Sequence, residues 1–387
     1  MTLPDTDPPA ALDRLAAANP AAASLLLLCG FLDPDHPIPV AALEAGAAAL
    51  PQPLAAALLD AAAREPLWDA LLYAAAGGVA RGELVVNAAL ARAAADRVDA
   101  DARRSWAEAA AQVMEKAFPT DPVKPESHPT CERLLPHARA ATGHAEQAGA
   151  GLAPAAQVLH LAGRYLLEVL ADPAAATDLL TRAAALRARA HGAGDVRVAW
   201  DLTYLNGALL QAGDWGVMAR NAVRSAEILE AAAGPRDQIV ITHVNNAALL
   251  LLRAGDTERA RTWFNRALGM AEPVFGGGHP FVATILSNLG DLHAREGDGE
   301  GARHAYRKAL MIDEKAYGPR HNSVARDLAK LGELLAAAGE GEAARPYLRR
   351  AAEWFTERDG ADDARVLALR ATLARIDAAR EADTRSA

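Results

Sequence analysis

Asparagine and arginine side chains recur at a fixed interval in the C-terminal half of the chain, and they have the chemistry of a binding site. Asn246 and Asn288 are 42 residues apart. An amide offers hydrogen-bond donors and an acceptor together, and a guanidinium pairs with carboxylates. A partner's acidic side chain or terminal carboxylate is therefore expected to contact the cations of this region. These are Arg253, Arg295, Arg326 and Lys330.

No group of residues has the spacing of a catalytic centre. Neither Ser225 nor His243 has a sequence partner that suggests a nucleophile with its base. The phosphate-binding pattern G-x-x-x-x-G-K-[ST] does not occur, and Gly276-Gly277-Gly278 lacks the lysine that such a loop requires. We therefore expect a protein that is not an enzyme and that binds no cofactor.

Four potential metal ligands lie within a stretch of 17 residues, at His128, Cys131, His137 and His144. Their spacing, H-x2-C-x5-H-x6-H, matches no structural zinc pattern, and a helix would spread these side chains over several faces. We interpret them as packing residues in a helical connector and expect no bound metal.

The positions of these residues follow from a repeat of 42 residues. The pairs Gly213-Asp214, Gly255-Asp256, Gly297-Asp298 and Gly339-Glu340 recur at this spacing, with Ala171-Asp172 one period earlier. Small residues recur in the same phase, as do the loop strings GPRDQ, GGGHP and GPRHN. A Gly-acid pair suits a tight turn between two helices, because glycine adopts positive φ and the acid caps the next helix.

Each repeat is predicted to be a helix, a turn, a second helix and a loop. In the third repeat the two helices are expected near 238–254 and 257–274, where apolar residues recur at helical spacing. Equivalent loop positions carry Asp195, Asp237, His279 and His321, which are predicted to be helix N-caps.

The string LSNLGDLHAREGDGEGARHAYRKALMIDEKAYGPRHN resembles the long tetratricopeptide repeat of kinesin light chains and of bacterial NB-ARC (STAND-type) regulatory ATPases. The resemblance covers residues 152–358 and implies an all-α, right-handed solenoid of five helix pairs followed by a capping helix. It also implies a concave groove lined by the first helix of each pair. The nucleotide-binding module of the regulatory ATPases has no counterpart in this sequence.

The resemblance assigns groove positions by their distance from the turn glycine. Nine residues before it stand Tyr204, Asn246, Asn288 and Lys330, and two before it stand Gln211, Arg253, Arg295 and Ala337. In the family, the amide at the first position clamps the backbone of an extended peptide. Two alternatives stay open: the asparagines bond neighbouring helices, and Asp291 and Glu333 neutralise the groove. Trp200 and Tyr204, one helical turn apart, are either aromatic anchors for a partner or core residues.

The front of the chain is predicted to be a small, mostly helical domain. Apolar helical segments at 21–31, 40–49, 54–63 and 66–76 are broken by prolines, and the run 77–86 is consistent with a β-hairpin. Three helices and a two-stranded wing would make a winged-helix domain. The strings FLDPDHPIP, AFPTDP and CERLLPHA resemble the segment before the repeats in NB-ARC proteins. The predicted order is an acidic, Pro-rich flexible tail (1–19), a winged-helix-like domain (20–100), a helical connector (101–151), five repeats (152–360), a capping helix (361–378) and a flexible tail (379–387).

Composition favours a soluble cytoplasmic protein. Aromatic residues make up 5% of the chain, so the core must come from Ala, Leu and Val. The N-terminus lacks the basic start of a secretion signal, the apolar run 21–32 is too short to span a bilayer, and the two cysteines form no disulfide pattern.

Two functions are consistent with these features. The first is a scaffold or sensor arm that binds a protein or peptide in the groove and passes this on to a separate nucleotide-binding or effector protein. The alternative is a transcriptional regulator with a DNA-binding winged helix and a ligand-sensing solenoid. Residues 1–151 carry 11 Lys and Arg against 19 Asp and Glu, which opposes nucleic-acid binding; a basic stripe at Arg92, Arg97, Arg103 and Arg104 would be needed. An enzymatic role comes third.

Overall fold

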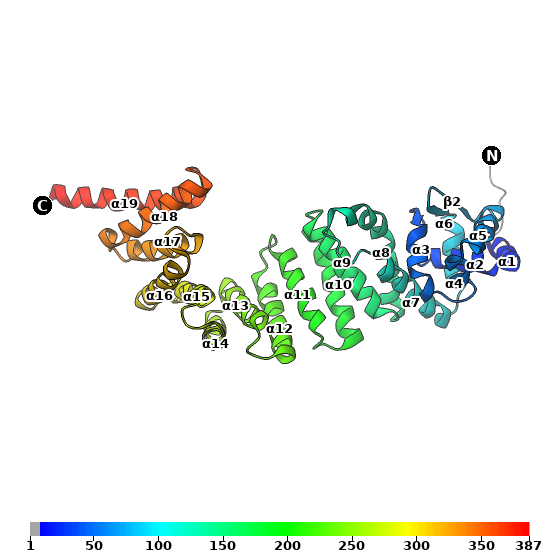
Figure 1. Cartoon of the computed structure of the whole chain (residues 1–387), viewed down its shortest axis with the longest axis horizontal. Helices are drawn as coiled ribbons and strands as arrows, with labels where there is room; N and C mark the ends of the chain where they lie inside the picture. The colour runs from blue at the N-terminus through cyan, green and yellow to red at the C-terminus, as the bar shows by residue number, and fades with distance from the viewer. Residues whose placement is uncertain (1–7, 387) are drawn as a thin grey trace. The chain divides into compact units, whose positions relative to one another are not determined.

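The computed structural model describes residues 8–386, and it is built almost entirely of helices (Figure 1). The chain divides into two compact units between Gly213 and Asp214. Within the described residues, unit 1 covers 8–213 and unit 2 covers 214–386. The prediction of an all-α fold with a helical solenoid is confirmed.

Unit 2 is a row of helices that follow one another in chain order, from green to red in Figure 1. The helices are α12 (Trp215–Ala233), α13 (Gln238–Arg253), α14 (Thr257–Phe275), α15 (Pro280–Arg295), α16 (Gly299–Tyr317), α17 (Asn322–Ala337), α18 (Gly341–Asp359) and α19 (Ala364–Ser386). Each helix packs on the next through buried apolar residues. The final core cluster includes Leu331, Leu348, Phe355, Val366 and Leu369.

The turns between helices have the geometry that the Gly-acid pairs predict. Gly255, Gly297 and Gly339 have φ values between +80° and +86°, a conformation that costs other residues energy. The Asp256 side chain accepts a hydrogen bond from the Arg259 amide at 3.2 Å, and Asp298 caps α16 in the same way. Glu340, in contrast, makes no side-chain cap bond.

The loops between repeats end in the predicted helix N-caps. Asp195 and Asp237 accept hydrogen bonds from amides of the following helices, and Nδ1 of His279 and of His321 does the same. The series continues at Asp363, which accepts from the Arg365 amide at 2.9 Å. Helix α19 therefore begins like the first helix of a further repeat.

Small residues allow the helices of a pair to approach closely. Ala260, Ala302 and Ala344 are fully buried at equivalent positions. A Cβ atom added to Gly290 in α15 would overlap the ring of Tyr306 in α16, and one added to Gly332 in α17 would lie 2.7 Å from Cγ of Leu348 in α18. The close approach requires glycine at both positions.

Unit 1 combines a small mixed domain with the first repeat helices. Its helices are α1 (Pro8–Ala18), α2 (Pro20–Cys29), α3 (Val40–Gly46), α4 (Leu54–Leu59), α5 (Ala61–Tyr73), α6 (Ala88–Asp96), α7 (Ala100–Ala117), α8 (His128–Ala148), α9 (Leu152–Glu168), α10 (Pro173–His191) and α11 (Val196–Leu209). Its strands are β1 (Ile38–Pro39), β2 (Gly77–Ala80) and β3 (Glu83–Val86). They form one antiparallel sheet in the order β1-β3-β2.

Several segments differ from the expectation. Part of the predicted N-terminal tail is helix α1, because Leu12 and Leu15 are buried; residues 1–7 lie outside the described part. Pro66 lies inside α5 instead of starting a helix, since Asp60 accepts a hydrogen bond from the Ala62 amide and so begins α5 earlier. At the other end, α19 continues to Ser386, through most of the predicted flexible tail.

Candidate functional site

The candidate groove residues of the third and fourth repeats lie next to one another on α13 and α15. We call Asn246, Arg253, Asn288 and Arg295 the first-helix face. The Asn288 amide donates to the Asn245 side-chain oxygen at 3.2 Å, and the Arg295 guanidinium donates to the Leu252 carbonyl. Both bonds join α15 to α13, so part of this polar chemistry holds the helices together.

Asn246 and Arg253 are the members of the face that remain most available to a partner. Both are exposed. The Arg253 guanidinium lies 5.7 Å from the centre of the Trp215 ring, which orients it without using its hydrogen-bond donors. An exposed amide and an oriented cation on one helix can bind a peptide backbone and an acidic side chain.

Lys330 is bound within the molecule. Its ammonium group donates to Asp291 at 2.7 Å and to the Ser287 hydroxyl at 3.1 Å. The Tyr306 hydroxyl donates to the other oxygen of Asp291 at 2.7 Å, and burial together with the Asp291 charge raises the pKa of Tyr306. This network joins α15, α16 and α17, so Lys330 acts here as a structural cation.

Arg326 faces buried carboxylates near α16. Its Nε lies 3.9 Å from Asp327, and its charge partly offsets the burial that raises the pKa of Asp313. Asp313 and Asp327 are both almost fully buried. The sequence reasoning did not anticipate these carboxylates, although a charged residue at an otherwise apolar helix position was the available signal.

In unit 1, Tyr204 of α11 lies beside two cationic or titratable side chains of α9. Its ring is 5.2 Å from that of His160 in an edge-to-face arrangement, and the Arg164 guanidinium lies 4.8 Å from its centre. Trp200, one turn earlier on α11, is 36% exposed. Tyr204 therefore packs against His160 and Arg164 and also lies near the partly exposed Trp200.

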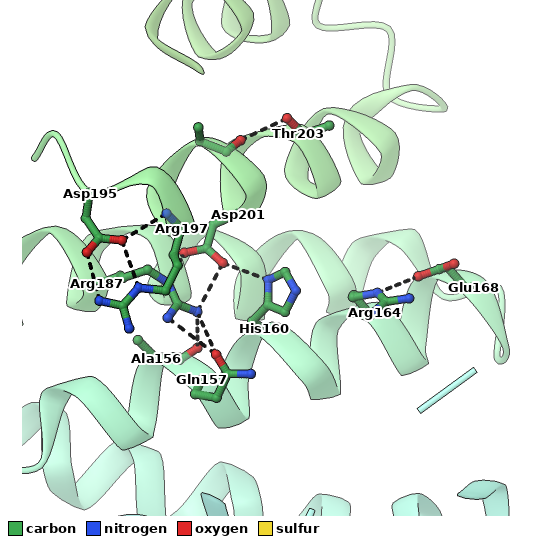
Figure 2. Close-up of polar contacts among 11 residues, drawn as sticks. Ala156, Gln157, His160, Arg164, Glu168, Arg187, Asp195, Arg197, Asp201 and Thr203 are labelled. Carbon is green, nitrogen blue, oxygen red and sulfur yellow. Dashed lines mark hydrogen bonds and ion pairs between the residues drawn. The ribbon is translucent and has the colours of Figure 1, made fainter. Parts of the chain in front are cut away.

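A buried ion pair between Arg187 and Asp201, which the sequence did not predict, lies beside His160 (Figure 2). The Arg187 guanidinium donates to Asp201 at 2.7 Å, and both side chains are almost completely buried. His160 Nδ1 lies 2.7 Å from the other Asp201 oxygen, and the Ala156 carbonyl accepts a further bond from Arg187. These bonds join α9, α10 and α11 and satisfy the buried charges.

The His/Cys stretch of the connector is used for packing. The His137 ring accepts from the Asp33 amide at 3.3 Å through Nδ1, so Nε2 donates to the Pro37 carbonyl at 3.1 Å. His144 packs on Phe31, and burial raises the pKa of Cys131 to about 11. Among the side chains that the structure describes, no three from His, Cys, Asp or Glu gather in a way that could hold a metal ion.

Ser225 and His243 lie closer together than the sequence suggests, with 3.3 Å between the serine oxygen and Nδ1. Ser225 is only 1% exposed, because it occupies one of the small-residue positions between helices. A substrate cannot reach a hydroxyl buried in this way, so the pair is structural.

The arginines of the basic stripe that DNA binding would require are held by other groups of unit 1. Arg92 pairs with Asp35, and Arg97 pairs with Asp13 at 2.9 Å. Arg103 donates to the Ala95 carbonyl, and Arg104 donates to the Ala148 carbonyl. Arg92, Arg97 and Arg103 each lie beside a carboxylate, which reduces the positive charge that a phosphate backbone would meet.

The comparisons with known proteins agree with the repeat architecture. A tetratricopeptide repeat family model matches residues 237–315 and 281–353. A comparison with curated protein sequences gives no match. Within the described residues, no helix has both the length and the apolar character needed to cross a bilayer.

Three solved structures are similar to parts of this chain. BtubC (BKLC) from P. vanneervenii is 20% identical with a TM-score of 0.46, covering 60% of this chain and 91% of that one. A putative kinesin light chain with nearly identical TPR-like repeats from Podosopora anserina is 14% identical with a TM-score of 0.45, covering 52% and 95%. The apo form of RapI is 13% identical with a TM-score of 0.48, covering 70% and 72%.

The family match and the helix pairs identify residues 237–353 as tetratricopeptide repeats. Repeat solenoids of this type present extended surfaces that bind other proteins. This part of the chain has that architecture.

Proposed function

We propose that the chain binds an extended peptide segment of a partner protein on the first-helix face of unit 2. The observation that supports this most directly is the exposed Asn246 amide beside the Asn288–Asn245 pair, one repeat apart. Backbone groups of an extended peptide would bond to these amides, and an acidic side chain would bond to Arg253.

Electrostatics support a partner with at least one carboxylate. Lys330 already neutralises Asp291, so that carboxylate does not compete for Arg253. Exposed hydrogen bonds of this kind give modest affinity, and specificity would come from the spacing of the partner's side chains along the face.

The remaining assignments are part of the same proposal. The three-stranded sheet and the helices around it would act as a winged-helix-like domain that passes the binding event to a separate effector or nucleotide-binding protein. A cytoplasmic location fits such a partner. The arginines of unit 1, three of which lie beside carboxylates, give little support to the alternative of a DNA-binding regulator.

The test uses selection from a random peptide library against the purified chain. The variant Asn246→Ala/Arg253→Ala removes the two exposed members of the face. Its matched control is Asn265→Ala/Arg307→Ala, which removes one exposed amide and one exposed arginine from the second helices α14 and α16.

We expect the selected peptides to share an acidic residue and to lose at least tenfold in affinity with the first variant but not with the control. Circular dichroism would establish that both variants stay folded. Peptides that bind both variants as tightly as the original chain would overturn the proposal.

A further inference from the structure

A pocket of about 600 Å³ lies between α17 and α19 at the end of unit 2. Its walls carry opposite charges: Glu333 and Glu342 come from α17 and α18, and Arg375 and Arg380 come from α19. Small and aliphatic side chains complete the lining, among them Ala336, Ala337, Ile376 and Ala379. The volume is within the range of sites for small ligands or single side chains.

One repeat earlier, a lysine fills the equivalent place. Lys330 of α17 reaches across to Asp291 of α15 and bonds to its carboxylate at 2.7 Å. Moving 42 residues along the chain, Asp291 becomes Glu333 and Lys330 becomes Thr372. The acid is kept, but the long cationic side chain that would reach it is replaced by a short hydroxyl.

Thr372 does not take over the role of the lysine. Its hydroxyl donates to the Ala368 carbonyl at 3.1 Å and accepts from the Arg375 guanidinium at 3.0 Å. Its hydrogen bonds are therefore made within α19, and Arg375 is held there too. Both residues line the pocket that remains in front of Glu333.

Glu333 has no hydrogen bond or ion pair within the described part of the chain. Although the Glu333 side chain is exposed to solvent, its partial desolvation raises its pKa, and Lys330 on the same helix opposes this shift. Glu342, by comparison, is 3.3 Å from Arg345. Glu333 is thus the carboxylate of this pocket that forms no direct ion pair within the described residues.

We propose that the pocket binds a primary ammonium group on a flexible alkyl chain, with Glu333 as its counter-ion. The ammonium group would take the place that Lys330 occupies in the preceding repeat, and the alkyl chain would pack on Ile376 and the neighbouring alanines. A lysine side chain of a partner protein and a free alkyl amine both offer this chemistry. The site does not depend on the first-helix face.

Three small probes separate these sources and isolate the charge. Nα-acetyl-lysine methylamide represents a lysine within a chain, and 1,5-diaminopentane represents a free amine. Nα-acetyl-norleucine methylamide has a similar alkyl chain without the ammonium group. Saturation-transfer NMR titrations on the full chain would give each dissociation constant at probe concentrations up to tens of millimolar.

Two variants test the site from opposite directions. Glu333→Gln removes the counter-ion, with Glu300→Gln as a control that removes an 87% exposed carboxylate of α16. Thr372→Lys restores the lysine of the earlier repeat and should fill the pocket, with Ala378→Lys as a control that adds the same charge elsewhere on α19.

We expect at least one amine probe to bind the original chain and the norleucine probe to bind at least tenfold more weakly. Glu333→Gln and Thr372→Lys should each weaken amine binding at least tenfold, whereas the controls should not. Thr372→Lys should also raise the melting temperature, and this rise should vanish in Glu333→Gln/Thr372→Lys. Absence of amine binding to the original chain, or equal binding to Thr372→Lys, would overturn the proposal.

Discussion

Asp327 shows how a single buried carboxylate can control the stability of the repeat array. It is fully buried in α17, accepts a hydrogen bond from Ser287 at 2.9 Å and leaves its second oxygen without a hydrogen-bond partner in the described structure. Burial raises its pKa from 3.8 to about 6; Ser287, Arg326 and Lys330 oppose this shift, and Asp313 adds to it.

The raised pKa of Asp327 predicts a loss of stability as pH rises. Between its unfolded and folded pKa values, the folded state binds more protons, so the free energy of unfolding falls with increasing pH. From pH 4.5 to 7.5 this residue should contribute a decrease of about 2 kcal/mol. Asp327→Asn keeps an acceptor for Ser287 but cannot ionise, so it should remove that part of the decrease.

Urea unfolding of both proteins at pH 4.5 and 7.5 would measure this difference. Because other groups titrate in the same range, the relevant quantity is the change between the two proteins. If the free energies of unfolding of the two proteins differed by the same amount at both pH values, Asp327 would not be the titrating group.

At this scale the sequence predicts residue types better than residue partners. The period of 42 places Asn288, Arg295 and Lys330 on the first helices of their pairs, but it does not reveal that each already bonds to a neighbouring helix. Partners such as Asp291 depend on the distance between helices, which the repeat pattern does not contain. Arg187 and Asp201 were missed for the same reason.

At the scale of helices, the distance between two members of a pair is set by small residues. Gly290 faces Tyr306 so closely that no side chain fits between α15 and α16. Gly290→Ala should therefore push the helices apart or displace the ring, which also donates to Asp291. We expect a loss of about 1–3 kcal/mol in the free energy of unfolding.

Gly299→Ala is the matched control for this change. Gly299 starts α16, and an added Cβ would meet no atom within 4 Å. Alanine there should be neutral or stabilise the helix by several tenths of a kcal/mol, because it restricts the unfolded chain. Thermal unfolding monitored by circular dichroism would compare Gly290→Ala with Gly299→Ala. Equal melting temperatures of the two variants would show that the α15–α16 contact adapts freely.

Helix boundaries were the most predictable feature of the elements. Repeated turn glycines and caps place α13 and α14 within one residue of the expected bounds, because each signal acts locally. The predicted helix start at Pro66 was wrong, because the N-cap at Asp60 starts α5 before this proline. Helix α1 was not predicted because it is stabilised by burial of Leu12 and Leu15 against other helices, which local signals in the sequence do not show.

At the scale of the whole chain, a repeat array is stabilised by contacts between neighbours, so its ends are its weakest part. Helix α19 covers the last pair in unit 2 and has no second helix of its own within the described residues. Val366 and Leu369 insert into the core formed by Leu331, Leu348 and Phe355. Loss of these contacts should loosen α17 and α18 before it affects the remaining repeats.

Leu369→Ala tests this order of unfolding. Leu369 is 2% exposed, so truncation should cost about 2–4 kcal/mol locally, whereas Leu367→Ala, at 52% exposure on the same helix, should cost little. Hydrogen exchange should accelerate in residues 322–381 of the Leu369 variant and stay unchanged in residues 8–213. Uniform acceleration across both units would instead mean that the chain unfolds as one cooperative body, in which case α19 would stabilise the entire array rather than its end.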